Sequence, residues 1–229
     1  MKISNLQKSF GRFSLNIEDL TLTNNKITGL IGPNGCGKST FAKILAGLIR
    51  PDSGTIEYDG IAQKDITLVP QKPYIMRDTV LANLTYPLKV RKIKPSTELI
   101  NHYLELAGME NLKHAYAPGL SSGEGQKLAL IRAMIFSPKL IFIDETFSNT
   151  DMESQARFEQ YILEGQKSNP ITWVIISHQL AVIKRMSSYV FFMHDGKIEE
   201  QGPTKSILAN PKTPHFIKYL NLMNRPTKD

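Results

Sequence analysis

Close to its N-terminus the chain reads Gly32-Pro33-Asn34-Gly35-Cys36-Gly37-Lys38-Ser39-Thr40. This run satisfies G-x-x-x-x-G-K-[ST], the pattern of loops that bind phosphate groups. The glycines let successive backbone N–H groups curve around an anion, the lysine ammonium neutralises negative charge, and the serine hydroxyl is a ligand for Mg²⁺. An apolar run precedes the loop and a helical pattern follows it, which distinguishes it from an ordinary glycine-rich turn. The sequence therefore predicts a nucleotide-binding site.

Apolar patterns around this loop predict an α/β fold with a parallel sheet. Residues 27–31 read as a buried strand, and apolar residues recur at helical spacing between 41 and 49. Apolar runs without alternation are typical of parallel strands covered on both faces. Three such runs follow in the chain, Leu140–Ile143, Trp173–Ile176 and Val190–Met193. Further strands are expected at residues 55–58 and 67–69, and helices at residues 152–163 and 179–186, in the strand and helix alternation of α/β folds.

Residues 72–134 show a helical pattern instead, with apolar side chains at 99, 103, 104 and 106 on one stripe. Pro87 and Pro95 are expected to interrupt it. We expect this segment to form a helical lobe inserted into a single domain that spans residues 1–229. The tail after Pro211 is expected to mix helix and loop, and residues 224–229 are expected to fray.

The composition of the 229-residue chain excludes fibrous and disordered classes, because 41% of its residues are hydrophobic and 21% are charged. No apolar run reaches the roughly 18 to 20 residues that a membrane-spanning helix needs. Residues 1–10 lack the pattern of a secretory signal, so we expect residence in the cytosol. The net charge of +7 permits an anionic partner such as a nucleotide, nucleic acid or anionic lipid.

The single cysteine, Cys36, has no partner for an internal disulfide and no neighbours at metal-ligand spacing. Its place inside the phosphate loop leaves two interpretations. Cys36 is an inert small residue, or its electropositive surroundings lower the pKa of the thiol and make it reactive.

Two carboxylates follow the apolar run at residues 140–143. Asp144, at the strand end, is placed to hold Mg²⁺ directly or through water, together with Ser39. Glu145 projects past the strand end toward an attacking water. Both carboxylates are needed for hydrolysis rather than for binding alone, so the sequence predicts a hydrolytic site.

Several segments resemble the motifs of ATP-binding cassette (ABC) ATPases, and they follow one another along the chain in the family's order. Gln71 matches the Q-loop glutamine, Leu140–Glu145 the Walker B strand with its glutamate, residues 148–151 the D-loop, and His178 the switch histidine. The signature motif is matched by Leu120-Ser121-Ser122-Gly123-Glu124-Gly125-Gln126-Lys127. The resemblance runs from about Lys2 to Gly202. It implies a P-loop NTPase core with a central, mostly parallel sheet, an N-terminal antiparallel β lobe and the inserted helical lobe.

The resemblance also implies Mg²⁺-dependent ATP hydrolysis. Lys38 and the loop amides would hold the β- and γ-phosphates. Gln71 would sense the γ-phosphate, Mg²⁺ and water, and would be both a catalytic residue and a metal contact. His178 would contact the γ-phosphate, although a lone histidine at a strand end is usually structural.

A head-to-tail dimer is implied as well. In the family each signature loop closes over the ATP held by the partner's phosphate loop, which gives Ser121 and Gly123 a role on the partner's nucleotide. Asp151 of the D-loop joins the same composite site. From the residues alone, this segment would be an ordinary capped helix start.

An aromatic residue is expected to stack on adenine. Phe10 matches the family's position, Phe13 is the competing choice, and a core role is the alternative for Phe10.

Three residues depart from the usual family pattern, and we expect them to slow closure or turnover. Ser122 stands where glycine is usual, which the backbone tolerates if φ stays negative. Glu124 replaces the usual glutamine and adds negative charge near the signature loop. Thr146 follows Glu145 where proline is usual.

The favoured function is the ATPase motor of a transporter, resembling importer cassettes for oxyanions such as tungstate or phosphate. The implied partners are a second copy of the subunit, separate integral membrane permeases and an extracytoplasmic substrate-binding protein, with the chain at the cytoplasmic face of the membrane. The helical lobe with its basic cluster Lys89, Arg91, Lys92 and Lys94 is the expected docking surface, or else a solvated face. The alternative is a soluble ABC ATPase that acts on nucleic acid or ribosomes. We favour the transporter and expect no nucleic-acid partner.

Overall fold

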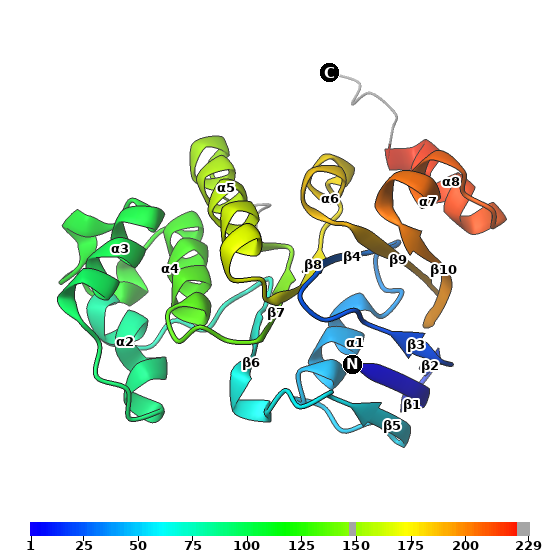
Figure 1. Ribbon diagram of the computed structural model, residues 1–229, viewed down its shortest axis with the longest axis horizontal. Coiled ribbons are helices and arrows are strands. Elements are labelled where there is room, and N and C mark those ends of the chain that lie inside the picture. The colour runs from blue at the N-terminus through cyan, green and yellow to red at the C-terminus, as the bar shows by residue number, and fades with distance from the viewer. Residues whose placement is uncertain (147–149, 224–229) are drawn as a thin grey trace.

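The computed structural model describes residues 1–146 and 150–223, and its elements are labelled in Figure 1. A six-stranded sheet forms the centre, in the order β10-β9-β4-β8-β7-β6. Its pairs are parallel except β9 with β10, which is an antiparallel hairpin. The strands are β4 (Ile27–Ile31), β6 (Ile66–Val69), β7 (Leu140–Asp144), β8 (Thr172–Ile176), β9 (Tyr189–His194) and β10 (Lys197–Pro203). The predicted central, mostly parallel sheet is confirmed.

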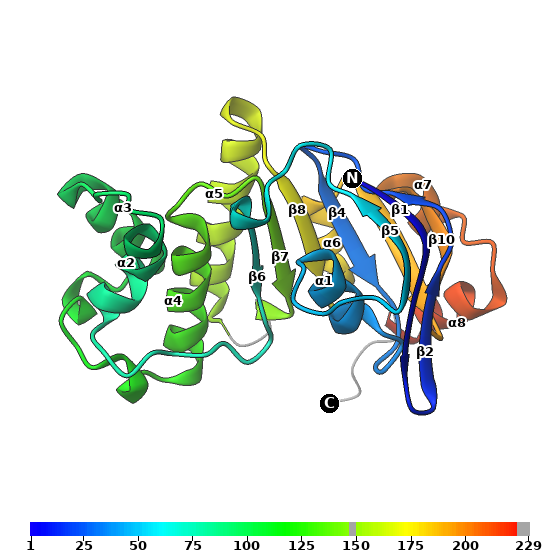
Figure 2. The ribbon, with the colours of Figure 1, turned by 90° about the horizontal axis from the view of Figure 1, so that it is seen from below.

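A second, antiparallel sheet is built from the N-terminal part of the chain. Strand β1 (Lys2–Phe10) pairs with β2 (Phe13–Ile17), β3 (Leu20–Thr21) and β5 (Ser53–Glu57). This sheet and helix α1 (Lys38–Leu45) cover one face of the central sheet, as Figure 2 shows. The predicted antiparallel β lobe is confirmed.

The other face of the central sheet is covered by helices α5 (Met152–Ser168), α6 (Leu180–Met186), α7 (Thr204–Ala209) and α8 (Pro214–Met223), as Figure 1 shows. Strand β7 shows why its sequence is apolar throughout. Ile141 and Ile143 belong to the core under α5 and α6, whereas Leu140 and Phe142 belong to the core under α1. Successive side chains of a strand point to opposite faces, so a strand between two cores needs apolar residues at every position.

Three helices stand beside the β6 edge of the sheet: α2 (Val80–Val90), α3 (Thr97–Ala107) and α4 (Ser122–Met134). Short 3-10 turns occupy Gln63–Asp65, Glu110–Leu112 and Ala117–Gly119. The expected helical pattern begins later than residue 72, because residues 72–78 form a loop. Asn83 holds this loop: its side chain accepts a hydrogen bond from the Met76 amide and donates one to the Met76 carbonyl.

Pro87 does not interrupt its helix, contrary to the expectation. It lies inside α2, whose buried Leu84 and Leu88 pack into the core of the lobe. Packing of an apolar face supplies most of a helix's stability in a protein, so it can outweigh one lost backbone hydrogen bond. Pro95 does lie between helices, just before Ser96, the N-cap of α3.

Other boundaries differ by a few residues. Helix α5 continues to Ser168, beyond the expected end at 163. Strand β5 overlaps the expected strand at 55–58, but it begins two residues earlier and ends one residue earlier. The tail after Pro211 contains α8, while the expected fraying of residues 224–229 concerns residues outside the described part of the chain. Among the described residues, no helix combines the length and apolar character needed to cross a bilayer.

Candidate functional site

The phosphate loop connects the buried strand β4 to α1, which begins at Lys38. Two of its glycines are required by close contacts. Gly32 has φ +150°, and a Cβ there would lie 2.0 Å from the Met193 carbonyl oxygen. Gly37 has φ +109°, and a Cβ there would lie 2.6 Å from Cζ of Phe13. The loop is therefore pressed between strand β9 and the ring of Phe13, which fixes its path.

A cavity of about 410 Å³ opens above this loop. Residues from the loop, the antiparallel sheet and the ends of the central strands line it together. They are Phe13, Asn34, Gly35, Gly37, Lys38, Ser39, Thr40, Gln71, Glu145 and His178. Gly32, Pro33 and Cys36 lie outside this lining. The structure thus brings most of the predicted loop residues together with all four predicted catalytic side chains, Lys38 from the loop itself and Gln71, Glu145 and His178 from elsewhere in the chain.

Lys38 is buried within the loop, with 6% of its surface exposed. Its Nζ donates hydrogen bonds to the carbonyl oxygens of Gly32 at 2.8 Å and Pro33 at 2.9 Å. A buried ammonium needs such partners, and a phosphate group is a stronger one because it carries negative charge. The N-terminus of α1 adds the positive end of its helix dipole at the same place. The loop therefore fits an anionic ligand.

Glu145 is the centre of a network at the ends of the central strands. Its Oε1 lies 2.5 Å from Nε2 of His178, and its Oε2 accepts a hydrogen bond from Nε2 of Gln71 at 2.8 Å. Glu145 has φ +53°, a conformation that is uncommon for residues other than glycine. Such backbone conformations persist where the surroundings enforce them, often at functional sites. The network holds the Glu145 carboxylate toward the cavity.

Asp144 lies deeper, with 4% of its surface exposed, and forms a hydrogen bond with the Ser39 side chain. Burial raises the pKa of Asp144, the hydrogen bond from Ser39 lowers it, and the neighbouring charge of Glu145 raises it further. A divalent cation favours the charged form of such a carboxylate. Hydroxyl and carboxylate oxygens are also the ligands that Mg²⁺ prefers, so Ser39 and Asp144 fit this ion.

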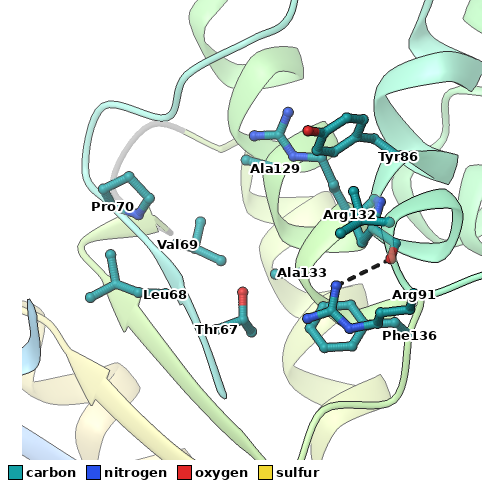
Figure 3. Close-up of a pocket in the computed structure, with 12 residues that line it drawn as sticks. Thr67, Leu68, Val69, Pro70, Tyr86, Arg91, Ala129, Arg132, Ala133 and Phe136 are labelled. Carbon is teal, nitrogen blue, oxygen red and sulfur yellow. Dashed lines mark hydrogen bonds between the residues drawn. The ribbon is translucent and has the colours of Figure 1, made fainter. Parts of the chain in front are cut away.

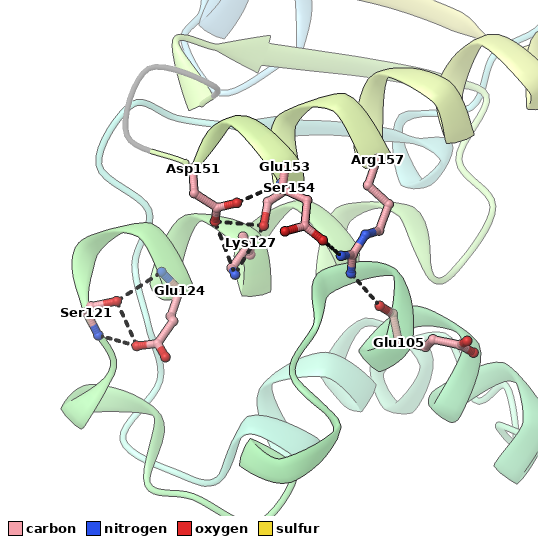
Figure 4. A network of polar contacts seen from close by, with 8 residues as sticks. All are labelled: Glu105, Ser121, Glu124, Lys127, Asp151, Glu153, Ser154 and Arg157. Atoms are coloured by element: carbon pink, nitrogen blue, oxygen red, sulfur yellow. Dashed lines mark hydrogen bonds and ion pairs between the residues drawn. The ribbon is translucent and has the colours of Figure 1, made fainter.

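The signature residues lie away from this cavity, at the start of α4 (Figure 4). The Ser121 hydroxyl accepts a hydrogen bond from the Glu124 amide, and the Glu124 carboxylate accepts hydrogen bonds from the amide and hydroxyl of Ser121. These hydrogen bonds lower the pKa of Glu124. Ser122 lies in the helix and its φ is negative, so its side chain fits the helix start as expected. Gly123 follows in the same exposed first turn.

Asp151 caps α5 next to this helix start. Its carboxylate accepts hydrogen bonds from the amide and hydroxyl of Ser154 and lies 3.7 Å from Nζ of Lys127, as Figure 4 shows. Of the predicted D-loop, Ser148 and Asn149 lie outside the described residues. Asp151, Ser121 and Gly123 are not part of the lining of the 410 Å³ cavity. Within one chain the signature region is therefore separate from the phosphate loop.

Of the two interpretations of Cys36, a thiol with a lowered pKa disagrees with the structure. Burial raises the pKa of the Cys36 thiol, and the Lys38 ammonium, whose Nζ lies 3.9 Å from Sγ, offsets only part of this. The side chain is 4% exposed and packs among apolar residues. An inert small residue is the interpretation that agrees with the structure.

The two candidate adenine-stacking residues face each other across a hairpin, with Phe10 paired to Phe13. Phe13 lines the cavity, whereas Phe10 does not and lies 45% exposed under the ammonium of Lys8. We expect Phe13→Ala to weaken ATP binding by roughly 5- to 100-fold, the range for losing an aromatic group stacked on a base. Titration with a fluorescent ATP analogue measures this, with Phe10→Ala as the matched control. A larger loss in Phe10→Ala than in Phe13→Ala would restore the choice made from the family resemblance.

Gln126 is a residue that the sequence did not single out for a role of its own. Its buried side chain donates from Nε2 to the backbone carbonyl of Gln71 at 3.1 Å. Six residues further along α4, Arg132 donates to the carbonyl of Tyr74 at 2.6 Å. Helix α4 therefore holds the loop that carries Gln71 at two points. Sequence spacing gave no signal for this contact, because the two segments are far apart in the chain.

Comparisons with known proteins agree with this geometry. A family model described as "ABC transporter" matches residues 15–148. The tungstate uptake system ATP-binding protein TupC of Peptoclostridium acidaminophilum is 34% identical over 86% of this chain and 96% of its own length. The sulfate/thiosulfate import ATP-binding protein CysA of Mesostigma viride is 32% identical over 99% of this chain and 68% of its own length.

Among solved structures, a dimeric ATP-binding cassette in a post-hydrolysis state with ADP and Pi has a similar fold. Its TM-score is 0.77 at 21% identity, covering 89% of this chain and 98% of that chain. The chain belongs to the ABC transporter family. It is an ATP-binding subunit with ATPase activity, and the resemblance drawn from its sequence is confirmed.

The Glu124 departure leads to a prediction about turnover. Glu124→Gln keeps a side chain that can complete the same capping box, but it removes a negative charge beside Ser121. If this loop meets the partner's triphosphate, relief of the repulsion should strengthen ATP-driven dimerisation by at least roughly fivefold, from about 1 kcal/mol for two unit charges about 4 Å apart in water, and turnover should rise with it. Steady-state ATPase assays and sedimentation measure both effects. Glu153→Gln, which removes the same charge from exposed α5, is the control, and equal changes in the two variants would contradict the prediction.

Proposed function

We propose that the chain hydrolyses Mg-ATP to drive import of a small oxyanion through separate membrane permease subunits. The single observation that carries the ATPase part is the convergence of Gln71, Glu145 and His178 on the cavity above the phosphate loop. The import part rests on the relatives, which are named as uptake or import ATP-binding proteins for tungstate and for sulfate/thiosulfate.

In the proposed mechanism Lys38 and the loop amides bind the β- and γ-phosphates and orient the γ-phosphate toward Glu145. Mg²⁺, held by Ser39 and Asp144 with Gln71 nearby, would neutralise charge on the phosphate oxygens. Glu145 polarises the attacking water from its position at the strand end. His178 donates a hydrogen bond from Nε2, which in this structure points to Glu145, to the charge that develops on the γ-phosphate.

The proposed site is completed by a second copy of the chain. The exposed start of α4 presents Ser121 and the amides around Gly123 with the positive end of a helix dipole. Ser121 and Gly123 do not line the cavity above the phosphate loop of their own chain. We therefore assign this helix start to the nucleotide that the partner chain binds. Asp151, at the start of the neighbouring helix α5, would lie at the same dimer interface.

The permease is proposed to dock on the helical lobe. A groove of about 200 Å³ lies between β6, α2 and α4 (Figure 3). Two large side chains in its lining are exposed, Tyr86 at 48% and Val90 at 60%. The Arg91 guanidinium is already engaged within the chain. It lies 3.6 Å from the centroid of the Phe136 ring and donates hydrogen bonds to the carbonyls of Pro87 and Lys64. Lys89, Lys92 and Lys94 are exposed at the end of α2 and in the loop after it.

This groove links a permease to the nucleotide through contacts described above. Its wall includes Arg132, which holds the Tyr74 carbonyl, and α4 also carries Gln126, which holds the Gln71 carbonyl. A movement of α4 therefore moves the loop whose Gln71 side chain contacts Glu145. Placement at the cytoplasmic face of the membrane and an extracytoplasmic binding protein that delivers the cargo belong to the same proposal.

The test is ATP-driven uptake into cells that express the chain together with candidate membrane permease subunits. We expect uptake of labelled tungstate or sulfate and no uptake of labelled methionine. Methionine is the competing cargo because a third relative, 33% identical to this chain, is named as a methionine import ATP-binding protein. Tyr86→Ala should lower uptake while ATP binding by the purified chain is unchanged. Tyr116→Ala is the control, because Tyr116 is also exposed, at 59%, and lies outside the lining of the groove. Stimulation of ATPase by nucleic acid with no uptake would favour the alternative function.

A further inference from the structure

Three side chains from separate elements meet at the end of strand β9, outside the lining of the phosphate cavity. His194 ends β9, Glu199 lies in β10, and His215 lies in the first turn of α8. Oε1 of Glu199 is 3.1 Å from Nδ1 of His194 and 2.9 Å from Nδ1 of His215. The two imidazole rings are stacked, with centroids 3.9 Å apart and an angle of 13° between their planes. The two imidazole nitrogens therefore contact the same carboxylate oxygen.

A β-bulge places Glu199 in this cluster. Ile198 pairs with Met193 and Glu200 with Phe192, so Glu199 is an extra residue without a cross-strand partner. In a regular strand, successive side chains would point to opposite faces. Here both glutamates reach the α8 segment, because Glu200 accepts hydrogen bonds from the amides of Lys212 and Thr213 while Glu199 contacts His215. Bulges commonly redirect a side chain next to a functional site.

The donor set is that of a transition-metal site. The three ligand atoms all lie within 4.8 Å of one another, so they are close enough to share one ion once the imidazole rings turn out of their stacked arrangement. Two histidines and one glutamate are a known ligand set for Zn²⁺, with an open fourth position for water. Oε2 of Glu199 is buried and has no hydrogen-bond partner among the described residues. Within that part of the chain, no lysine or arginine forms an ion pair with Glu199 either.

We propose that His194, Glu199 and His215 form a binding site for a divalent transition metal, with Zn²⁺ as the ion that the ligands fit best. The histidines would ligate through Nδ1, and the partial exposure of all three side chains gives the ion access from solvent. The site would fasten α8 to the β9–β10 hairpin. That hairpin also supports the phosphate loop, since the Gly196 amide donates to the Cys36 carbonyl at 3.0 Å. The site is distinct from the proposed Mg²⁺ ligands Ser39 and Asp144.

The test is a calorimetric titration of the full, tag-free chain with Zn²⁺ in a buffer that contains excess Mg²⁺. We expect one tight site per chain, and a loss of affinity in His215→Ala at least as large as the roughly 10- to 100-fold seen when only a second-shell partner is removed. Glu199→Gln keeps the size of the side chain and should also weaken binding. His114→Ala, an exposed histidine of the helical lobe, is the control and should bind Zn²⁺ like the unaltered chain.

Co²⁺ substitution identifies the ligands independently of affinity. We expect a cobalt spectrum typical of nitrogen and oxygen ligands, without a thiolate-to-cobalt charge-transfer band. A thiolate band would place the metal at Cys36 and overturn the proposal, as would equal Zn²⁺ affinity in His215→Ala, Glu199→Gln and the unaltered chain. His215 is 55% exposed, so its variant is expected to fold, and circular dichroism in the presence of EDTA checks this.

Discussion

Glu145→Gln is expected to lower ATP turnover by at least about 10²- to 10³-fold, the loss typical of removing one preorganised catalytic group. Glutamine has nearly the same shape and can still form a hydrogen bond with Gln71, but it cannot polarise the attacking water as a carboxylate does. Lys38, Ser39 and Asp144 are untouched, so ATP should still bind. Because the γ-phosphate then persists, the variant should accumulate as an ATP-bound dimer. Single-turnover hydrolysis and sedimentation with Mg-ATP measure the two effects.

The matched control is Glu153→Gln, which makes the same chemical change on α5, where the side chain is 84% exposed and pairs with Arg157. It should hydrolyse ATP at the rate of the unaltered chain. Full activity in Glu145→Gln would show that another group activates the water. Loss of ATP binding together with turnover would show that Glu145 supports the loop rather than the reaction.

The sequence was most informative where a local pattern determines a local structure. The phosphate loop needs glycine at 32 because a Cβ there would meet the Met193 carbonyl, and at 37 because φ is +109°. The surrounding strand and helix have clear apolar periods. Strand β7 could be recognised because its burial between two cores requires an apolar side chain at each position before Asp144. In these segments the chemistry of single residues carries the prediction.

Tertiary contacts explain what the sequence did not reveal. Phe10 and Phe13 are directly paired, so their side chains lie on the same face of the hairpin. The choice between them depends on which of the two strands lies over the phosphate loop, and alternation along one strand does not specify that. Pro87 reads as a helix break, yet α2 accommodates it because its buried leucines anchor the helix on both sides. Cys36 lies two residues before Lys38, whose charge lowers the pKa of the thiol, but burial raises that pKa by more.

The cluster of His194, Glu199 and His215 shows the same limit more strongly. No spacing rule joins these positions, because the bulge at Glu199 changes the direction of its side chain and α8 supplies the third ligand from a separate segment. The contact from Gln126 to the Gln71 carbonyl likewise spans 55 positions in the chain. Contacts between residues so far apart in the sequence become visible only in the folded structure.

Restoration of activity by mixing two inactive variants is the second large effect that we expect. Lys38→Ala removes the ammonium of the phosphate loop, and Ser121→Phe places a bulky ring at the exposed start of α4. Each variant alone should lose at least about 10²-fold in ATPase activity, because every site of its dimer lacks one essential part. Ser121→Phe also removes a helix cap worth about 1 kcal/mol, so its folding is checked by thermal denaturation.

In a mixed dimer the two defects fall in one site. The chain with Ser121→Phe contributes an intact phosphate loop, the chain with Lys38→Ala contributes an intact signature loop, and together they form one complete site. Equal mixing should recover about a quarter of the activity, because half of randomly formed dimers are mixed and each of these has one good site of two. If each chain instead completed its own site, no partner could rescue either defect, and the mixture would be as inactive as its components. The measurement therefore separates a shared site from a self-contained one without relying on the effect of any single substitution.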